Sequence, residues 1–199
     1  MAAAAMRVGV FGGTFDPPHV GHLIVATEAH RALELDRLLF VPAALPPHKG
    51  GGVHTSPRVR LEMVRRAIRG DQRFGAEDVE VRRAGPSYTI DTLRIFAERM
   101  PGAELFLLIG ADNLRDFSAW REPRQIMSLA RLVVLARAGE EGDGTVPAIR
   151  IPVTRIDVSS TAIRRRVGAG ESIRYLVPEA VRRMVERHGL YQPSLSSTE

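Results

Sequence analysis

The sequence contains no cysteine and a single lysine, Lys49, and none of its apolar runs is long. Without cysteine the chain has no disulfide bond, no thiolate-bound metal and no cysteine nucleophile. A membrane-spanning helix requires about 20 consecutive apolar residues, which no segment approaches. The first residues also lack the basic region and apolar core of a secretion signal. We therefore expect a soluble, cytoplasmic protein with no membrane partner.

The composition nevertheless allows a sizeable hydrophobic core. Hydrophobic residues make up 44% of the 199 positions and charged residues 26%, which is typical of a globular chain. At this length we expect a single domain over residues 1–192, with flexible ends at 1–5 and 193–199. The sequence leaves the oligomeric state open.

The net charge is positive, at +5. A basic surface attracts phosphate groups and can therefore indicate a nucleic-acid partner. Here nearly all of the positive charge is arginine, acidic residues are interspersed along the chain, and the dense basic run at 164–166 is short. We therefore expect no nucleic acid among the partners.

Apolar segments of strand length alternate with helical segments along the chain. The expected strands cover 7–11, 37–42, 76–83, 104–110, 131–137 and 149–154. The expected helices begin near residue 20, cover 57–70, 87–102 and 178–189, and include a short segment after residue 159. Segment 76–83 is assigned to an edge strand because polar residues alternate with valines in it.

This alternation predicts an α/β fold of the Rossmann-like, doubly wound type, with a mostly parallel sheet and helices on both faces. In such sheets, ligands bind beyond the carboxyl ends of the strands, where the strand order reverses. Residues 12–22, 42–57 and 110–121 each follow a predicted strand. We therefore expect these three segments to converge on one site.

The first candidate motif is GGTFDPPHVGHL, residues 12–23. Gly12 and Gly13 allow the backbone to approach a bulky anion closely and to adopt dihedral angles that a side chain forbids. Gly21 and His22 fall at a helix start, where unpaired amides and the helix dipole favour phosphate. His19 lies three residues before His22, so both imidazoles can donate to the same anion. The motif therefore predicts a phosphate cradle.

Other interpretations of this motif remain open. The histidines could be ordinary surface and cap residues, or could bind zinc together with Asp16. The glycine spacing differs from the dinucleotide-binding fingerprint, and the lysine of a P-loop is absent.

The second candidate motif is DVSSTAIRRR, residues 157–166. Ser159 or Ser160 can cap a short helix, with Thr161 in its first turn and arginines one turn later. Hydroxyls, amides and an arginine so placed suit the oxygens of a polyphosphate. Taken alone, the motif is more typical of a purely structural cap, and its value as a signal comes from its occurrence together with the first motif.

Together, the His-x-Gly-His element at 19–22 and SSTAIR at 159–164 resemble the HxGH nucleotidyltransferase superfamily. PPHK at 46–49, SYTIDTL at 87–93, IGADNL at 109–114 and Trp120 follow in the order typical of bacterial nicotinate-nucleotide adenylyltransferases. The chain is similar to that family over nearly its whole length.

The resemblance implies transfer of AMP from ATP to nicotinic acid mononucleotide, with Mg²⁺ held mainly by the ATP phosphates and no protein ligand set for a metal. It implies that His19, His22 and Arg164 are catalytic. It implies an ATP site formed by Gly12, Gly13, Thr14, Phe15, Gly21, Ser159, Ser160 and Thr161. It implies a mononucleotide site formed by His48, Lys49, Tyr88, Thr89, Asp112 and Trp120.

Within the mononucleotide site, the resemblance assigns Trp120 to stacking on the nicotinate ring and the amides near Thr89 to its carboxylate. Asp112 is assigned to the ribose region, and His48 and Lys49 to the phosphate. Trp120 could instead be a core residue, and the loop that contains His48 and Lys49 could simply be solvated.

Three alternative functions remain open. Phosphopantetheine adenylyltransferases share both phosphate motifs, although their chains are usually shorter and lack the Ser-Tyr-Thr and tryptophan elements. Nicotinamide mononucleotide could be preferred to the acid, because an amide and a carboxylate are nearly isosteric. Finally, the chain could be a nucleotide-sensing or nucleic-acid-binding module that kept the fold and lost the chemistry.

Overall fold

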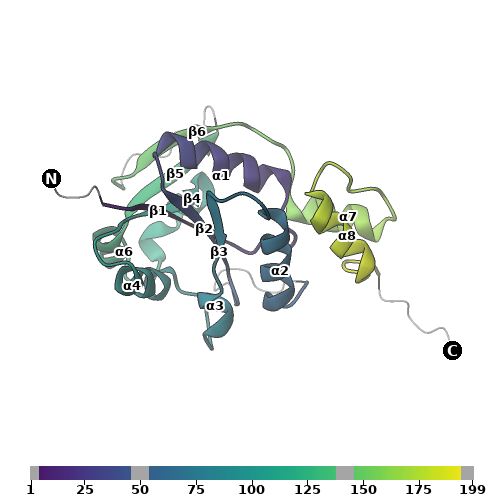
Figure 1. The fold of residues 1–199 in the computed structure, drawn as a ribbon, viewed down its shortest axis with the longest axis horizontal. Helices are drawn as coiled ribbons and strands as arrows, with labels where there is room; N and C mark the ends of the chain where they lie inside the picture. Colours follow the sequence, from purple (N-terminus) through teal and green to yellow (C-terminus); the bar gives the residue numbers. More distant parts are fainter. Residues whose placement is uncertain (1–4, 46–53, 138–145, 194–199) are drawn as a thin grey trace.

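The computed structural model describes residues 5–45, 54–137 and 146–193 (Figure 1). Within these residues the strands form one parallel sheet in the order β3-β2-β1-β4-β5-β6. The strands are β1 (Arg7–Gly13), β2 (Arg37–Pro42), β3 (Phe74–Ala76), β4 (Glu104–Gly110), β5 (Arg131–Arg137) and β6 (Ile149–Val153). The chain moves outward in one direction from β1 to β3 and then restarts beside β1 with β4. The strand order therefore reverses between β1 and β4, where doubly wound sheets bind their ligands.

The helices between these strands cover both faces of the sheet, as expected, and two more helices follow the last strand (Figure 1). The longer ones are α1 (Val20–Ala32), α2 (Pro57–Ala67), α4 (Thr89–Arg99), α7 (Ser160–Gly168) and α8 (Glu179–Arg187). The shorter ones are α3 (Val79–Arg82), α5 (Ala111–Arg115), the 3₁₀ turn η1 (Phe117–Ala119) and α6 (Pro123–Leu129). None of the described helices is both long enough and apolar enough to cross a membrane.

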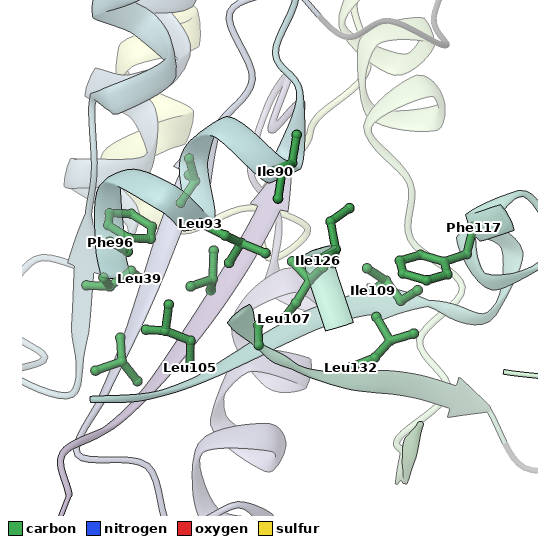
Figure 2. Close-up of a cluster of buried hydrophobic side chains, with 14 of the residues drawn as sticks. Leu39, Ile90, Leu93, Phe96, Leu105, Leu107, Ile109, Phe117, Ile126 and Leu132 are labelled. Carbon is green, nitrogen blue, oxygen red and sulfur yellow. The ribbon is translucent and has the colours of Figure 1, made fainter. Parts of the chain in front are cut away.

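Alternate residues of each central strand point into two separate cores, as the two-residue period of a strand requires. On one face, Leu105, Leu107 and Ile109 of β4 pack against α4, including Leu93 and Phe96 (Figure 2). Each such side chain contributes about 1.5–3 kcal/mol when it is fully buried. This face therefore anchors the start of α4 beside the carboxyl end of β4.

The opposite face of the sheet is covered by α1 and α2. Ala26 and Ala29 of α1 and Leu33 just after it pack against the strands there, together with Val64 of α2 and Ile68 just after that helix. Small residues on α1 let this helix approach the sheet closely.

A third apolar cluster lies outside the sheet and joins α2 to the two C-terminal helices. Met63 of α2 packs with Ile163 of α7 and Val181 of α8. Figure 1 shows α7 and α8 side by side next to α2, at the edge of the molecule. This cluster places the start of α7 near the carboxyl ends of the strands, although α7 is remote from β1 in the sequence.

Two local expectations are wrong. Segment 76–83 is not a strand: β3 ends at Ala76, and α3 follows with Val79 and Glu80, which are adjacent in sequence and both buried. Two adjacent buried residues do not fit the expected edge strand, in which buried and exposed side chains would alternate. The expected serine or threonine cap of the helix near 87–102 is also absent, because the cap position is Tyr88 and its side chain makes no cap bond.

The predicted domain limits fall partly on residues that the structure does not describe. Residues 1–4 and 194–199 lie outside the described residues, as do His48 and Lys49. The span of 1–192 with flexible ends therefore stays a prediction.

Candidate active site

A cleft of about 1050 Å³ opens at the carboxyl ends of β1 and β4, where the strand order reverses. It is lined by segments that follow β1, β4 and β6 and by the starts of α1, α4 and α7. Every predicted site residue that the structure describes lines this cleft: Gly12, Gly13, Thr14, Phe15, His19, Gly21, His22, Tyr88, Thr89, Asp112, Trp120, Ser159, Ser160, Thr161 and Arg164. The two remaining predicted residues, His48 and Lys49, lie outside the described residues.

Phe15 and Gly13 determine the shape of the loop after β1. Phe15 is buried and has a positive φ of 50°. Neither Gly12 nor Gly13 has a positive φ. The expectation that these glycines supply unusual dihedral angles is therefore wrong. Gly13 is needed for another reason, because a Cβ there would lie 2.6 Å from the Phe15 ring. A Cβ on Gly12 would meet nothing within 4 Å, so the backbone at Gly12 is open to a ligand.

His19 and His22 lie together at the start of α1. Their rings stack with centroids 3.7 Å apart and planes 25° apart. The backbone amide of His19 donates to Nδ1 of His22 over 3.1 Å. Because Nδ1 of His22 accepts this bond, the proton of the neutral ring resides on Nε2, which is then a donor. The ring is also held edge-on to Phe15, with centroids 5.0 Å apart.

His19 is uncharged at neutral pH. Its side chain is only 8% exposed, and burial lowers its pKa to about 4. Its buried Nδ1 has no hydrogen-bond partner among the described residues. This atom is enclosed by the protein and has no surface exposed to the cleft, so its missing hydrogen bond costs folding free energy.

The zinc alternative is not supported by the geometry. The described residues contain no group of three or more His, Asp or Glu side chains suited to a metal ion. Both oxygens of the buried Asp16 carboxylate already accept hydrogen bonds, from the amide of His54 and from the hydroxyls of Thr55 and Tyr191. Asp16 is therefore a structural acceptor within the loop.

The start of α7 is attached directly to the loop after β1. Ser159 caps the helix by accepting from the amide of Ala162, while the Ser160 hydroxyl donates to the carbonyl oxygen of Pro17 over 2.8 Å. Because a hydroxyl has one proton and this one is donated to Pro17, Ser160 can donate to a phosphate only through its backbone amide. First-turn amides of this kind have no partner within the helix and are suited to anions.

Arg164 lies one turn further along α7. Nη1 donates to the carbonyl oxygen of Asp16 over 2.8 Å, and Nη2 contacts the hydroxyl of Thr161 at 3.3 Å. These bonds orient the guanidinium beside the histidine pair and leave further N–H donors for a ligand. Two motifs far apart in the sequence therefore form one continuous surface of the cleft.

The other end of the cleft is aromatic and polar. Tyr88 and Thr89 form the start of α4. The half-buried Trp120 packs against Phe117, with the centroids of the two rings 5.4 Å apart. The guanidinium of Arg121 lies 4.8 Å from the centre of the Tyr88 ring. Trp120 is thus part of the cleft wall and not a fully enclosed core residue.

Comparisons with known proteins agree with this geometry. The model of the cytidylyltransferase-like family matches residues 10–166. A probable nicotinate-nucleotide adenylyltransferase from Thermus thermophilus is 46% identical over 94% of this chain and 100% of its own length. The chain belongs to the nicotinate-nucleotide adenylyltransferase family. A relative of the same name from Thermomicrobium roseum is 45% identical over 94% of this chain and 92% of its own.

Solved structures of distant nicotinate-nucleotide adenylyltransferases share the fold. The nicotinic acid mononucleotide adenylyltransferase of Plasmodium falciparum, solved in complex with NaAD, superposes with a TM-score of 0.78 at 17% identity. The alignment covers 94% of this chain and 97% of the other. A putative nicotinate-nucleotide adenylyltransferase from Vibrio parahaemolyticus gives a TM-score of 0.70 at 21% identity, over 96% and 98% of the two chains.

In this member of the nicotinate-nucleotide adenylyltransferase family, sequence reasoning missed several cleft residues. Arg121 directly follows Trp120 in a polar stretch, and that adjacency was a usable signal. Glu80 lines the cleft from α3 but had been assigned to a strand. Asn113 lines it from within IGADNL, next to the predicted Asp112, and Ile156 lines it from a segment without a motif.

Proposed function

We propose that this protein transfers the adenylyl group of ATP to nicotinic acid mononucleotide, giving nicotinic acid adenine dinucleotide and pyrophosphate, in NAD biosynthesis. One observation carries the proposal: a single cleft joins the starts of α1 and α7 to an aromatic wall beside the start of α4. Membership of the family supports it. The partners are therefore small molecules, and a cytoplasmic location is part of the proposal.

In this reaction an oxygen of the mononucleotide 5′-phosphate attacks the α-phosphorus of ATP. The new P–O bond forms as the bond to the bridging oxygen of the β-phosphate breaks, and pyrophosphate leaves. The protein supplies no nucleophile, so it accelerates the reaction by aligning the two phosphates and stabilising the developing charge.

We assign that stabilisation first to His22. The bond from the His19 amide to Nδ1 of His22 makes Nε2 the donor, and the ring is fixed against Phe15. A donor that is already oriented needs no rearrangement as charge builds on the α-phosphate. The neutral His19 ring stacks on His22 with centroids 3.7 Å apart and helps to hold this donor in place. A contact between His19 and the ATP phosphates stays a prediction.

The β- and γ-phosphates are assigned to the start of α7. The backbone amides of Ser160 and Thr161 and the guanidinium of Arg164 supply the donors there. The described residues contain no metal-binding cluster of their own. In this proposal a divalent cation, Mg²⁺, enters with ATP and neutralises charge on its phosphates.

The mononucleotide is assigned to the other end of the cleft. Trp120 stacks on the nicotinate ring, the first-turn amide of Thr89 binds its carboxylate, and Asp112 reaches the ribose. The amide of Tyr88 already donates to the carbonyl oxygen of Pro86 over 3.1 Å, so Tyr88 is assigned to the wall through its side chain. The roles of His48 and Lys49 remain predictions from the sequence.

The test is pyrophosphate release with ATP and Mg²⁺ and three acceptors: nicotinic acid mononucleotide, nicotinamide mononucleotide and 4′-phosphopantetheine. We expect the acid mononucleotide to be preferred. Preference for either other acceptor would retain the phosphate site and replace the substrate assignment. Failure with all three, together with salt-sensitive DNA binding, would favour the binding-module alternative.

A further inference from the structure

Arg60 is a fully buried arginine that binds three different segments around the cleft. It lies on α2 with a relative exposure of 0%. Nη1 donates to the carbonyl oxygen of Thr14 over 2.8 Å, Nη2 to that of Ala44 over 3.1 Å and Nε to that of Thr55 over 3.2 Å. A guanidinium has a rigid fork of donors and can bind three divergent carbonyls at once, which an ammonium group at a single point cannot.

A carboxylate beside Arg60 binds the same region to the C-terminal part of the chain. Oδ1 of Asp16 accepts from the hydroxyls of Thr55 and Tyr191, each over 2.7 Å, and Oδ2 accepts from the amide of His54 over 2.7 Å. Tyr191 follows α8, 175 residues after Asp16. Burial and the neighbouring Asp16 raise the pKa of Tyr191, so its hydroxyl remains a donor.

These bonds continue from Ala44 to the wall assigned to the mononucleotide. The amide of Ala44 donates to Oγ of Ser87 over 2.9 Å, and Ser87 directly precedes the start of α4. Glu80, which also lines the cleft, accepts from the hydroxyl of Thr92 over 2.7 Å. The Arg60 network, defined as Arg60, Asp16, Thr55, Tyr191 and Ser87, therefore spans from the loop after β1 to the start of α4.

The position of Arg60 and Tyr191 behind the cleft argues for an indirect role. Neither side chain lines the cleft, although Thr14, Asp16 and Ser87 do. An in-line transfer between two bound substrates depends on the relative placement of their subsites, and a misplacement of about 1 Å can cost roughly 100-fold in rate. The network connects the backbone of those two subsites.

We propose that Arg60 and Tyr191 are positioning residues for adenylyl transfer, and that the Arg60 network sets the phosphate-binding loop at a fixed distance from the mononucleotide wall. This inference rests on the proposed function. It requires that the alignment of the two substrates, and not the affinity for either one, depends on the network. The expected signature is a loss of kcat with little change in either KM.

The test compares Arg60→Lys and Tyr191→Phe with the wild type, and uses Arg66→Lys as the matched control. Arg66 lies on the same helix, is exposed, and pairs with Glu62 at 2.8 Å. Rates are divided by the folded fraction measured by circular dichroism at the assay temperature. We expect kcat to fall by about tenfold or more for Arg60→Lys and about threefold or more for Tyr191→Phe, with both KM values within about threefold of wild type.

The outcomes separate this inference from the proposed function. No turnover by the wild type would overturn both. Wild-type turnover with an unchanged kcat per folded molecule in Arg60→Lys would overturn this inference alone, because a purely stabilising residue lowers only the folded fraction. If Arg60→Lys does not fold, Tyr191→Phe decides: a lower kcat at unchanged KM supports the inference, and an unchanged kcat overturns it.

Discussion

The backbone amide of His19 donates to Nδ1 of His22, and the two rings stack with centroids 3.7 Å apart. One residue thereby sets the tautomer of the other, so that Nε2 of His22 is the donor. The glycine between them is part of this arrangement, because a Cβ on Gly21 would lie 3.1 Å from Nδ1 of His19. The compact His-x-Gly-His element is therefore a geometric unit as well as a sequence motif.

Replacing His22 tests the assigned donor. We expect His22→Ala to lower kcat by about 100-fold or more, because an oriented donor to developing charge is removed. His188→Ala, an exposed histidine at the end of α8, is the control and should leave kcat unchanged. Steady-state pyrophosphate release and a thermal melt measure activity and folding together. Near-wild-type turnover of His22→Ala would remove the assigned role.

Replacing Arg164 tests the assignment of the triphosphate. We expect Arg164→Ala to raise the KM for ATP by about tenfold or more, because a charge-assisted contact to phosphate is lost. Arg165→Ala removes an exposed arginine at the next position of α7 and should have little effect. Varying ATP at a saturating mononucleotide concentration gives the comparison. Equal KM values in the two variants would count against the assignment.

Trp120 is expected to affect one substrate more than the other. Loss of stacking on an aromatic ring costs about 1–3 kcal/mol, so Trp120→Ala should raise the KM for the mononucleotide by about fivefold to 100-fold. The KM for ATP should change much less, and Trp120→Phe should retain most of the affinity. Equal increases for both substrates in Trp120→Ala would instead indicate a general disturbance of the cleft.

The buried His19 should make stability depend on pH. Its pKa is lowered from 6.5 in the unfolded chain to about 4 in the folded protein, so the unfolded state binds more protons between these values. Stability is therefore lost as the pH falls from about 6.5 toward 4, by about 2 kcal/mol between pH 6.5 and pH 5. Urea unfolding of the wild type and of His19→Asn at pH 7 and pH 5 measures this. The same pH dependence in both proteins would contradict it.

The enzymatic activity, in contrast to the stability, should not depend on the titration of His19 near neutral pH. Because the folded protein keeps His19 neutral down to about pH 4, His19 should produce no acidic limb in kcat/KM between pH 6 and pH 8. An acidic limb in that range that disappears in His19→Asn would show that burial does not hold this ring neutral.

Most of the fold could be predicted because its signals are local. Buried strands such as β4 and β5 are continuous apolar runs, and α2 begins at Pro57 after a serine cap, so both appear in any short window of sequence. Segment 76–83 failed because alternating valines mimic a strand, while the burial of Glu80 depends on its bond to Thr92 in another helix. No local window contains that partner.

The candidate site likewise combines features that are visible in the local sequence with contacts that depend on packing. Residue type and short-range spacing are enough to identify the two candidate motifs, the lone tryptophan and most of the order of strands and helices. Packing in three dimensions is needed to find that the Ser160 hydroxyl binds Pro17, that Arg164 binds the carbonyl of Asp16, and that Arg60 is buried with carbonyl partners in three segments. These contacts join segments far apart in the chain, and they exist because burying a polar group requires a partner that only packing can supply.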